Sequence, residues 1–251
     1  MKKICTILGV VLLVSLILQS CGDASKPKKP VSTVQEKESN ADSTTIEEPV
    51  ISVPTIKIGQ QEWMANDINT ATYNNGDPIN EAKSETKWKD FSNKKLGCYR
   101  KLSNGTYVYN GYAIKDERGI VPTGFLIPNY DQFNKLISFL GGGDSQSGKA
   151  TKSLATYSIF IEDWVGDQET GGLESVEIKS SGSSGFKAKN GGYVYDNGAL
   201  DTEGNCSYWW TSSSEGANKI AVDIGYCSQD LGGGKGSYPL TYGFAVRAIK
   251  K

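Results

Sequence analysis

The stretch RGIVPTGFLIPNYDQFNKLISFLGGG, residues 118–143, contains the signals that place a short strand, a helix and the end of that helix. Asn129 is suited to the N-cap, and Gln132 completes a capping box that satisfies backbone N–H groups otherwise left without partners. Gly141 predicts the end of the helix, because glycine takes the left-handed C′ conformation without steric cost. The helix is about three turns long, and its apolar face is predicted to consist of Tyr130, Phe133, Leu136, Ile137 and Leu140. Strands from elsewhere in the chain are expected to pack against this face.

The composition of the 251-residue chain excludes several classes of site. Lys and Arg number 27 against 28 Asp and Glu, so the net charge of -1 gives no general electrostatic reason to bind nucleic acid. The chain has no histidine, and it therefore cannot by itself build a Ser/His/Asp triad, a Cys/His pair or a histidine-containing zinc site. Glycine (29) and tyrosine (13) are abundant, which suits short strands joined by tight turns.

The first 20 residues have the features of an export signal peptide. A basic start precedes a nearly unbroken apolar run over residues 4–18, which is too short for a comfortable membrane span. The following LQSC, residues 18–21, resembles the lipobox of bacterial lipoproteins, in which the cysteine accepts a diacylglyceryl group and becomes the mature N-terminus. The resemblance implies lipid attachment at Cys21, with acyl chains such as palmitate holding the protein on a membrane. Ordinary secretion after cleavage nearby is the alternative.

Residues 21–54 are predicted to form a disordered tether that starts at the lipidated cysteine. From Gly22 to Pro54 the chain has no aromatic residue and few large apolar ones. Such a segment cannot bury enough apolar surface to offset the entropy lost on ordering. The folded domain is expected to span residues 55–251, a length that fits one domain with its own core.

The pattern within the domain indicates many short strands and few helices. Alternation over residues 55–58 and again over residues 62–64, on either side of Gly59, predicts an opening hairpin. Ser84 is predicted to cap a short helix that carries Trp88. Further strands are expected at residues 107–109, 112–114, 176–178, 193–195, 207–212, 220–224 and 243–249. We therefore predict an α+β domain, with residues 142–191 as a long irregular region.

Ten short motifs occur in a characteristic order and cover essentially everything from Thr55 onward. They are IGQQEWMANDIN (58–69), NGDPI (75–79), RG (118–119), PTGF (122–125), IP (127–128), LGG (140–142), SGF (184–186), NGG (190–192), YWWTSS (208–213) and YGFAVR (242–247). In this order they resemble the Fibrobacter succinogenes major paralogous domain (FISUMP) family, which is common in exported lipoproteins of Bacteroidetes and Fibrobacteres. The chain departs from the family pattern at Ala248 and in residues 144–183.

The resemblance implies a fold like that of the formylglycine-generating enzymes, also called sulfatase-modifying factors, and of the C-type lectins. Such a domain has a twisted, mostly antiparallel sheet, few short helices and long loops. The resemblance implies no particular reaction, because the family has no established general activity. Neither a cofactor nor a metal site is predicted, since the acidic segment 162–169 lacks an EF-hand spacing. The glycine-rich residues 232–237 lack the Ser or Thr of a phosphate loop and are interpreted as a flexible hairpin end.

Three cysteines remain in the predicted domain. In an oxidising compartment, Cys206 and Cys227 are expected to pair, because both flank predicted strands near the two adjacent tryptophans. Cys98 is then unpaired, and a buried hydrophobic cysteine is favoured over a reactive thiol because no histidine can activate it. An enzyme that acts through Cys98 or the Cys206/Cys227 pair is the alternative, as formylglycine-generating enzymes work through copper-binding cysteines.

Trp209 and Trp210 are the candidate ligand contacts. Neighbouring residues on a strand point to opposite faces, so one ring can lie in the core while the other stacks on a sugar or a peptide. The interpretation that both are structural is favoured over such a contact, since large aromatic side chains dominate protein cores.

The function favoured by the sequence is a non-enzymatic binding or adhesion module at the cell envelope, on the outer membrane. Its expected partners are the membrane, through the lipid anchor, and a glycan or protein ligand; nucleic acid is not expected. Two alternatives stay open: an envelope enzyme related to formylglycine-generating proteins, and a structural component of a surface assembly that associates through an exposed sheet edge.

Overall fold

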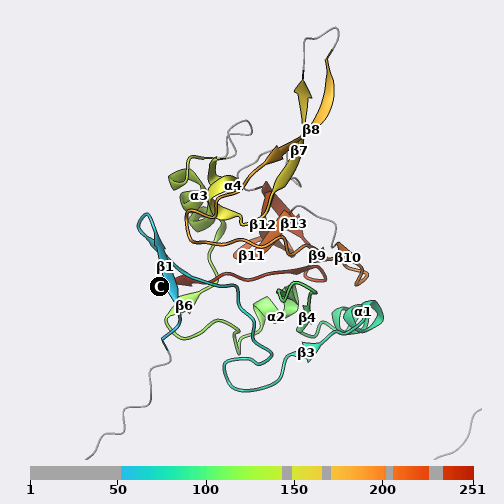
Figure 1. The fold of residues 1–251 in the computed structure, drawn as a ribbon. Helices are drawn as coiled ribbons and strands as arrows, with labels where there is room; N and C mark the ends of the chain where they lie inside the picture. The colour runs from blue at the N-terminus through green and yellow to red at the C-terminus, as the bar shows by residue number, and fades with distance from the viewer. Residues whose placement is uncertain (1–51, 143–148, 166–170, 202–205, 226–233) are drawn as a thin grey trace, which may run out of the picture. The chain divides into compact units, whose positions relative to one another are not determined.

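The computed structural model describes residues 52–142, 149–165, 171–201, 206–225 and 234–251 (Figure 1). The predicted signal peptide and nearly all of the tether lie outside these residues, and so do Cys21 and Cys227. In the part of the chain that is described, no helix is both long enough and apolar enough to cross a membrane.

Two sheets together contain the strands found in residues 55–126, 193–201 and 243–250. The first sheet consists, in spatial order, of β1 (Thr55–Ile58), β2 (Gln61–Met64), β15 (Ile249–Lys250) and β6 (Phe125–Leu126). The second consists of β10 (Leu200–Asp201), β9 (Tyr193–Val194), β14 (Gly243–Phe244), β5 (Tyr107–Asn110), β4 (Cys98–Lys101) and β3 (Asn80–Glu81). All pairs in these two sheets are antiparallel except β3 with β4.

The remaining strands and the helices complete an α+β domain that is mostly sheet. The third sheet consists of β11 (Cys206–Glu215), β12 (Asn218–Gly225) and β13 (Gly234–Tyr238), and a separate antiparallel pair consists of β7 (Ile159–Val165) and β8 (Gly172–Ile178). The described helices are α1 (Glu85–Asn93), α2 (Gly111–Lys115), α3 (Tyr130–Phe139) and α4 (Lys149–Leu154). Short helices beside small, mostly antiparallel sheets agree with the predicted α+β class.

Helix α3 begins and ends as the sequence predicts. The Asn129 side chain accepts a hydrogen bond from the Gln132 N–H at 2.8 Å, and the Gln132 side chain accepts one from the Asn129 N–H at 2.8 Å. At the other end, Gly141 has a φ of +115°, and the Gly142 N–H donates to the Ile137 carbonyl at 3.0 Å. Both ends of α3 are therefore determined by local hydrogen bonds.

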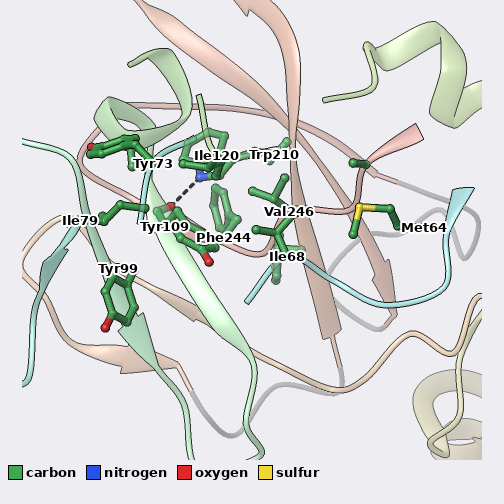
Figure 2. Close-up of a cluster of buried hydrophobic side chains, with 14 of the residues drawn as sticks. Met64, Ile68, Tyr73, Ile79, Tyr99, Tyr109, Ile120, Trp210, Phe244 and Val246 are labelled. Atoms are coloured by element: carbon green, nitrogen blue, oxygen red, sulfur yellow. Dashed lines mark hydrogen bonds between the residues drawn. The ribbon is translucent and has the colours of Figure 1, made fainter. Parts of the chain in front are cut away.

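Strand β11 separates two core clusters. On one side Trp209 packs edge-on against Phe186, with ring centres 5.5 Å apart, in the cluster that also contains the buried face of α3. On the other side Trp210 packs against Phe244, with ring centres 4.6 Å apart, and donates its indole N–H to the Tyr109 carbonyl at 2.7 Å (Figure 2). The prediction that the two tryptophans point to opposite faces is confirmed.

The prediction of a strand at residues 112–114 is wrong, because α2 occupies this segment. The Asn110 side-chain oxygen accepts a hydrogen bond from the Ala113 N–H at 3.0 Å and so acts as the N-cap. The Tyr-Ala-Ile sequence has a β preference that depends on context, whereas the cap satisfies a helix N–H that would otherwise have no partner.

The predicted final strand, residues 243–249, is divided between two sheets. β14 belongs to the second sheet and β15 to the first, and the residues between them make other backbone contacts. The Val246 carbonyl accepts from the Ile68 N–H at 2.8 Å, and the Ala248 carbonyl accepts from the Met64 N–H at 2.9 Å. This segment consequently joins the first two sheets instead of lying within one of them.

Two loop predictions also need correction. Residues 142–191, expected to be largely irregular, contain α4, β7 and a β8 that is longer than the predicted strand at 176–178 and includes it. Of the glycine-rich residues 232–237, those from 234 onward are part of β13, which pairs with β12; residues 232 and 233 lie outside the described residues. Glycine is unfavourable in strands by itself, so pairing with the neighbouring strand determines this structure.

Candidate functional site

Neither predicted aromatic contact is at the surface. Trp209 is 1% exposed and Trp210 is 0% exposed. Each indole N–H has a partner within the protein: Trp209 donates to the Asp67 carboxylate at 2.9 Å, and Trp210 donates to a backbone carbonyl. The hypothesis that one of the rings contacts a ligand is therefore wrong. Both tryptophans are structural core residues, as the favoured interpretation of the sequence has it, because the sheet is covered on both faces at this point.

The cysteines lie in interior or undescribed positions. Cys206 is buried and takes part in a disulfide. Its predicted partner Cys227 lies outside the described residues, as does the predicted lipid attachment site Cys21, so both assignments stay predictions. Among the residues that the structure describes, no group of three or more His, Cys, Asp or Glu side chains is placed to hold a metal ion.

Cys98 is the first residue of β4 and is a free, fully buried thiol. Burial raises the pKa of this thiol to about 12. The reactive form of a cysteine is the thiolate, which is scarce at neutral pH when the pKa is this high. The position of Cys98 agrees with the predicted hydrophobic role.

We expect native Cys98 to resist alkylation by N-ethylmaleimide at about pH 8 and to react readily once the protein is unfolded in guanidinium chloride. Peptide mapping by mass spectrometry measures the extent of modification at this residue in both states. Equal rates in the two states would contradict the burial and the raised pKa described above.

A solvent-open pocket of about 450 Å³ is lined by residues of β3, of α2 and of the segment between α1 and β4, together with loop residues. We call it the Lys95 pocket. It is lined by Tyr73, Asn80, Lys95, Leu96, Gly97, Tyr112, Lys115, Asp116, Arg118 and Leu240. Its volume is in the range of small-ligand sites, and its wall combines aromatic, aliphatic and charged groups.

One wall of the pocket is held by a network around Arg118. The guanidinium contacts both carboxylate oxygens of Asp116, at 2.8 and 2.7 Å, and a carboxylate oxygen of Asp77 at 2.9 Å. It also lies over the Tyr73 ring, 3.9 Å from the ring centre. Asp116 and Arg118 thus form an ion pair two residues apart within a turn.

The same network changes the acidity of the groups around it. The hydrogen bonds from Arg118 lower the pKa of the Asp116 carboxyl, which is therefore ionised at neutral pH. Burial, followed by the negative charge of Asp116, raises the pKa of Tyr73 to about 12, so its hydroxyl stays protonated. Arg118 is thus a cation whose charge is compensated by two acidic partners.

Other lining segments of the pocket are held in place by the Asn110 side chain, which is fully buried. Its oxygen accepts from the N–H groups of Cys98 and Ala113, both at 3.0 Å, and its amide donates to the Leu96 carbonyl at 2.9 Å. The Asn110 side chain therefore holds three segments together: the start of β4, the start of α2 and the segment after α1. A Leu240 carbonyl, which accepts from the Gly111 N–H at 2.8 Å, closes the same corner.

Lys95 occupies a backbone conformation that usually belongs to glycine. Helix α1 ends at the cap residue Lys94, and Lys95 follows with a φ of 55°. Its N–H donates to the Ser92 carbonyl at 3.0 Å, and the Leu96 N–H donates to the Phe91 carbonyl at 2.9 Å. This is the hydrogen-bond pattern of a Schellman cap, in which the left-handed residue is most often glycine.

No sequence motif identifies the residues of the Lys95 pocket. The sequence gives no reason to associate Lys95 with Lys115, which lies twenty positions away. One local signal is available: the helix predicted after Ser84 has no glycine or asparagine directly after its last turn, where a lysine pair, Lys94 and Lys95, stands instead.

The fold and the pocket together define an α+β domain with a small-ligand-sized surface site and a buried free cysteine. A sequence model of the family described as the Fibrobacter succinogenes major domain matches residues 56–250. The chain belongs to this family. Comparison with curated proteins finds no match, and comparison with solved structures finds none either.

Proposed function

We propose that this protein is a lipid-anchored, non-enzymatic binding or adhesion module of the cell envelope that holds a glycan or protein ligand in the Lys95 pocket. The observation that supports it best is the pocket itself: two tyrosines and two leucines stand next to charged and amide groups on an open surface. Apolar surface for contact area and a few polar groups for orientation are the usual composition of a binding site.

The proposal includes a fold related to the C-type lectins and the formylglycine-generating enzymes. The mostly antiparallel small sheets, the few short helices and the connections between them are compatible with that relation. The non-enzymatic part is supported by Cys98, since a fully buried thiol with a raised pKa is a poor nucleophile.

Binding is tested with the full chain in detergent micelles on an array that carries neutral and acidic glycans, together with a pull-down from envelope extracts. We expect one ligand class to be retained and to be lost in the variant Tyr112→Ala, which removes an aromatic wall of the pocket while leaving the Asn110 and Arg118 networks in place. The absence of any ligand, or a ligand that is insensitive to Tyr112→Ala, would count against the proposed site.

Membrane attachment is proposed to occur through Cys21 on the outer membrane. Labelled palmitate should be incorporated into the wild-type protein and not into Cys21→Ser, because the acyl chains are carried by this cysteine. The matched control is Cys5→Ser, which alters the only other cysteine of the N-terminal segment and should leave labelling unchanged. Equal labelling of wild type and Cys21→Ser would refute acylation at this position.

A further inference from the structure

Two cations of the Lys95 pocket have no acidic partner within the described residues. The seven salt bridges found there include Arg118 with Asp116 and Asp77, but neither Lys95 nor Lys115. Both lysines are exposed and line the same pocket. The pocket therefore has an excess of positive charge that its own carboxylate, already bound by Arg118, does not neutralise.

Lys95 occupies a position where glycine would give a more stable backbone. The left-handed region costs a residue with a Cβ atom on the order of 1 kcal/mol, and glycine occupies it freely. The only other non-glycine residue with a positive φ among the described residues is Lys187. Backbone strain of this kind is concentrated at binding and catalytic sites, where the side chain has a role that outweighs the strain.

The neighbourhood of Lys115 adds like charge. Lys219 is largely buried, and its ammonium donates to the Ser212 carbonyl at 2.6 Å. Burial, followed by the positive charge of Lys115, lowers the pKa of Lys219. Lys115 is thus close enough to another lysine for the two to repel, and an anion bound beside Lys115 would reduce this repulsion.

The rest of the wall fits a ligand with one acidic group and several hydroxyls. The half-buried Tyr112 ring and the aliphatic Leu96, which is 43% exposed, provide apolar surface for the face of a sugar ring. Asp116 is a hydrogen-bond acceptor at the edge of the pocket, which favours hydroxyl donors and disfavours a second carboxylate. A saccharide has such donors around its whole ring, whereas a peptide terminus does not.

We propose that the Lys95 pocket binds an acidic saccharide, with the ammonium groups of Lys95 and Lys115 on a sugar carboxylate and Tyr112 against the sugar ring. This inference rests on the proposed binding function and specifies its ligand class. It assigns Lys95 a binding role that explains why glycine does not occupy the α1 cap.

The test measures binding of trigalacturonate and a glucuronate trisaccharide to the full chain in zwitterionic detergent by isothermal titration calorimetry. Their methyl esters serve as uncharged analogues of the same shape. At least one uronate should bind, and its ester should bind about 10-fold or more weakly, since a charge-assisted hydrogen bond is lost. Lys95→Gln and Lys115→Gln should weaken uronate binding by a similar factor.

Lys94 provides the matched control. It is adjacent to Lys95 and exposed, but it is paired with Asp90 at 3.0 Å and does not line the pocket. Lys94→Gln should therefore leave the uronate affinity unchanged. Lys95→Gly should weaken binding as Lys95→Gln does and at the same time raise the melting temperature by about 2–4 °C, because it relieves the backbone strain. A purely structural lysine would not combine a gain in stability with a loss of binding.

The inference is overturned if neither uronate binds, if an ester binds as well as its acid, or if Lys94→Gln weakens binding as much as Lys95→Gln. Binding of an acetylated tripeptide with a free carboxylate, without uronate binding, also overturns it. Neutral glycans that bind and depend on Tyr112 would overturn the acidic specificity while the proposed function stands. If no glycan and no protein ligand binds, both the acidic specificity and the proposed binding function are overturned.

Discussion

Asp67→Ala should lower the free energy of unfolding by about 3–5 kcal/mol, because it leaves a buried guanidinium without its counter-charge. The Arg247 side chain is 2% exposed, and its Nε contacts the Asp67 carboxylate at 2.6 Å. The same carboxylate oxygen accepts from the Trp209 indole at 2.9 Å. Removal of Asp67 thus leaves the Arg247 charge without its counter-charge and the Trp209 indole N–H without its acceptor. Either loss alone lowers the free energy of unfolding.

The measurement is urea denaturation followed by tryptophan fluorescence, with two further variants for comparison. Asp67→Asn keeps an oxygen acceptor and loses only the charge, so it should lose about half as much stability and still fold. Glu62→Gln breaks the exposed ion pair with Lys250 at 3.0 Å and should change stability by about 1 kcal/mol or less. If Asp67→Ala behaves like Glu62→Gln, the buried pair does not have the assigned role.

Asn110→Ala should lower the free energy of unfolding by about 3–4 kcal/mol, the second large effect expected in this domain. The substitution removes the N-cap of α2 and leaves the Cys98 N–H and the Leu96 carbonyl without their partner. These groups are in or next to the core, where water cannot readily replace the missing hydrogen bonds. The Lys95 pocket should also lose its shape, since Leu96 and α2 form two of its sides.

Asn129→Ala is the matched control for this prediction. Asn129 is also an asparagine N-cap, but it is exposed and its bonds stay within α3. The control should lose only about 1 kcal/mol. Equal losses in the two variants would show that Asn110 acts as an ordinary cap and does not hold separate elements together.

Much of the fold follows from local patterns. The capping box at Asn129, the apolar stripe of α3 and the glycine after it are all contained in one segment, and the structure has each of them. The Ser84 cap and the opening hairpin are also local and are present. Such features can be predicted because the hydrogen bonds that determine them join residues a few positions apart.

The misassigned segments involve partners far away in the chain. The predicted strand at 243–249 is divided because its backbone contacts Met64 and Ile68, about 180 positions earlier. The strand at 234–238 forms in a glycine-rich sequence because β12 pairs with it. No local preference includes such contacts, and packing decides between the alternatives.

For the candidate site too, local patterns predicted one part and long-range contacts decided the rest. Alternation along β11 predicts that Trp209 and Trp210 lie on opposite faces, yet whether a face is covered depends on Phe186, Phe244 and their surroundings. Both faces are covered, so the tryptophans are core residues and the surface site lies elsewhere. The Lys95 pocket combines side chains from the ends of α1 and α2, which approach each other only in the folded domain.

The amino-acid sequence by itself determined the family, the α+β class, the start of α1, both ends of α3 and the opposite orientation of the two tryptophans. The tertiary structure alone decided which aromatic rings are buried, where the last strand divides and which lysines share a pocket. The physical reason is the range of the interactions: caps, turns and periodicity act over a few residues. Burial, ion pairing and pocket shape arise from contacts between segments that only folding brings together.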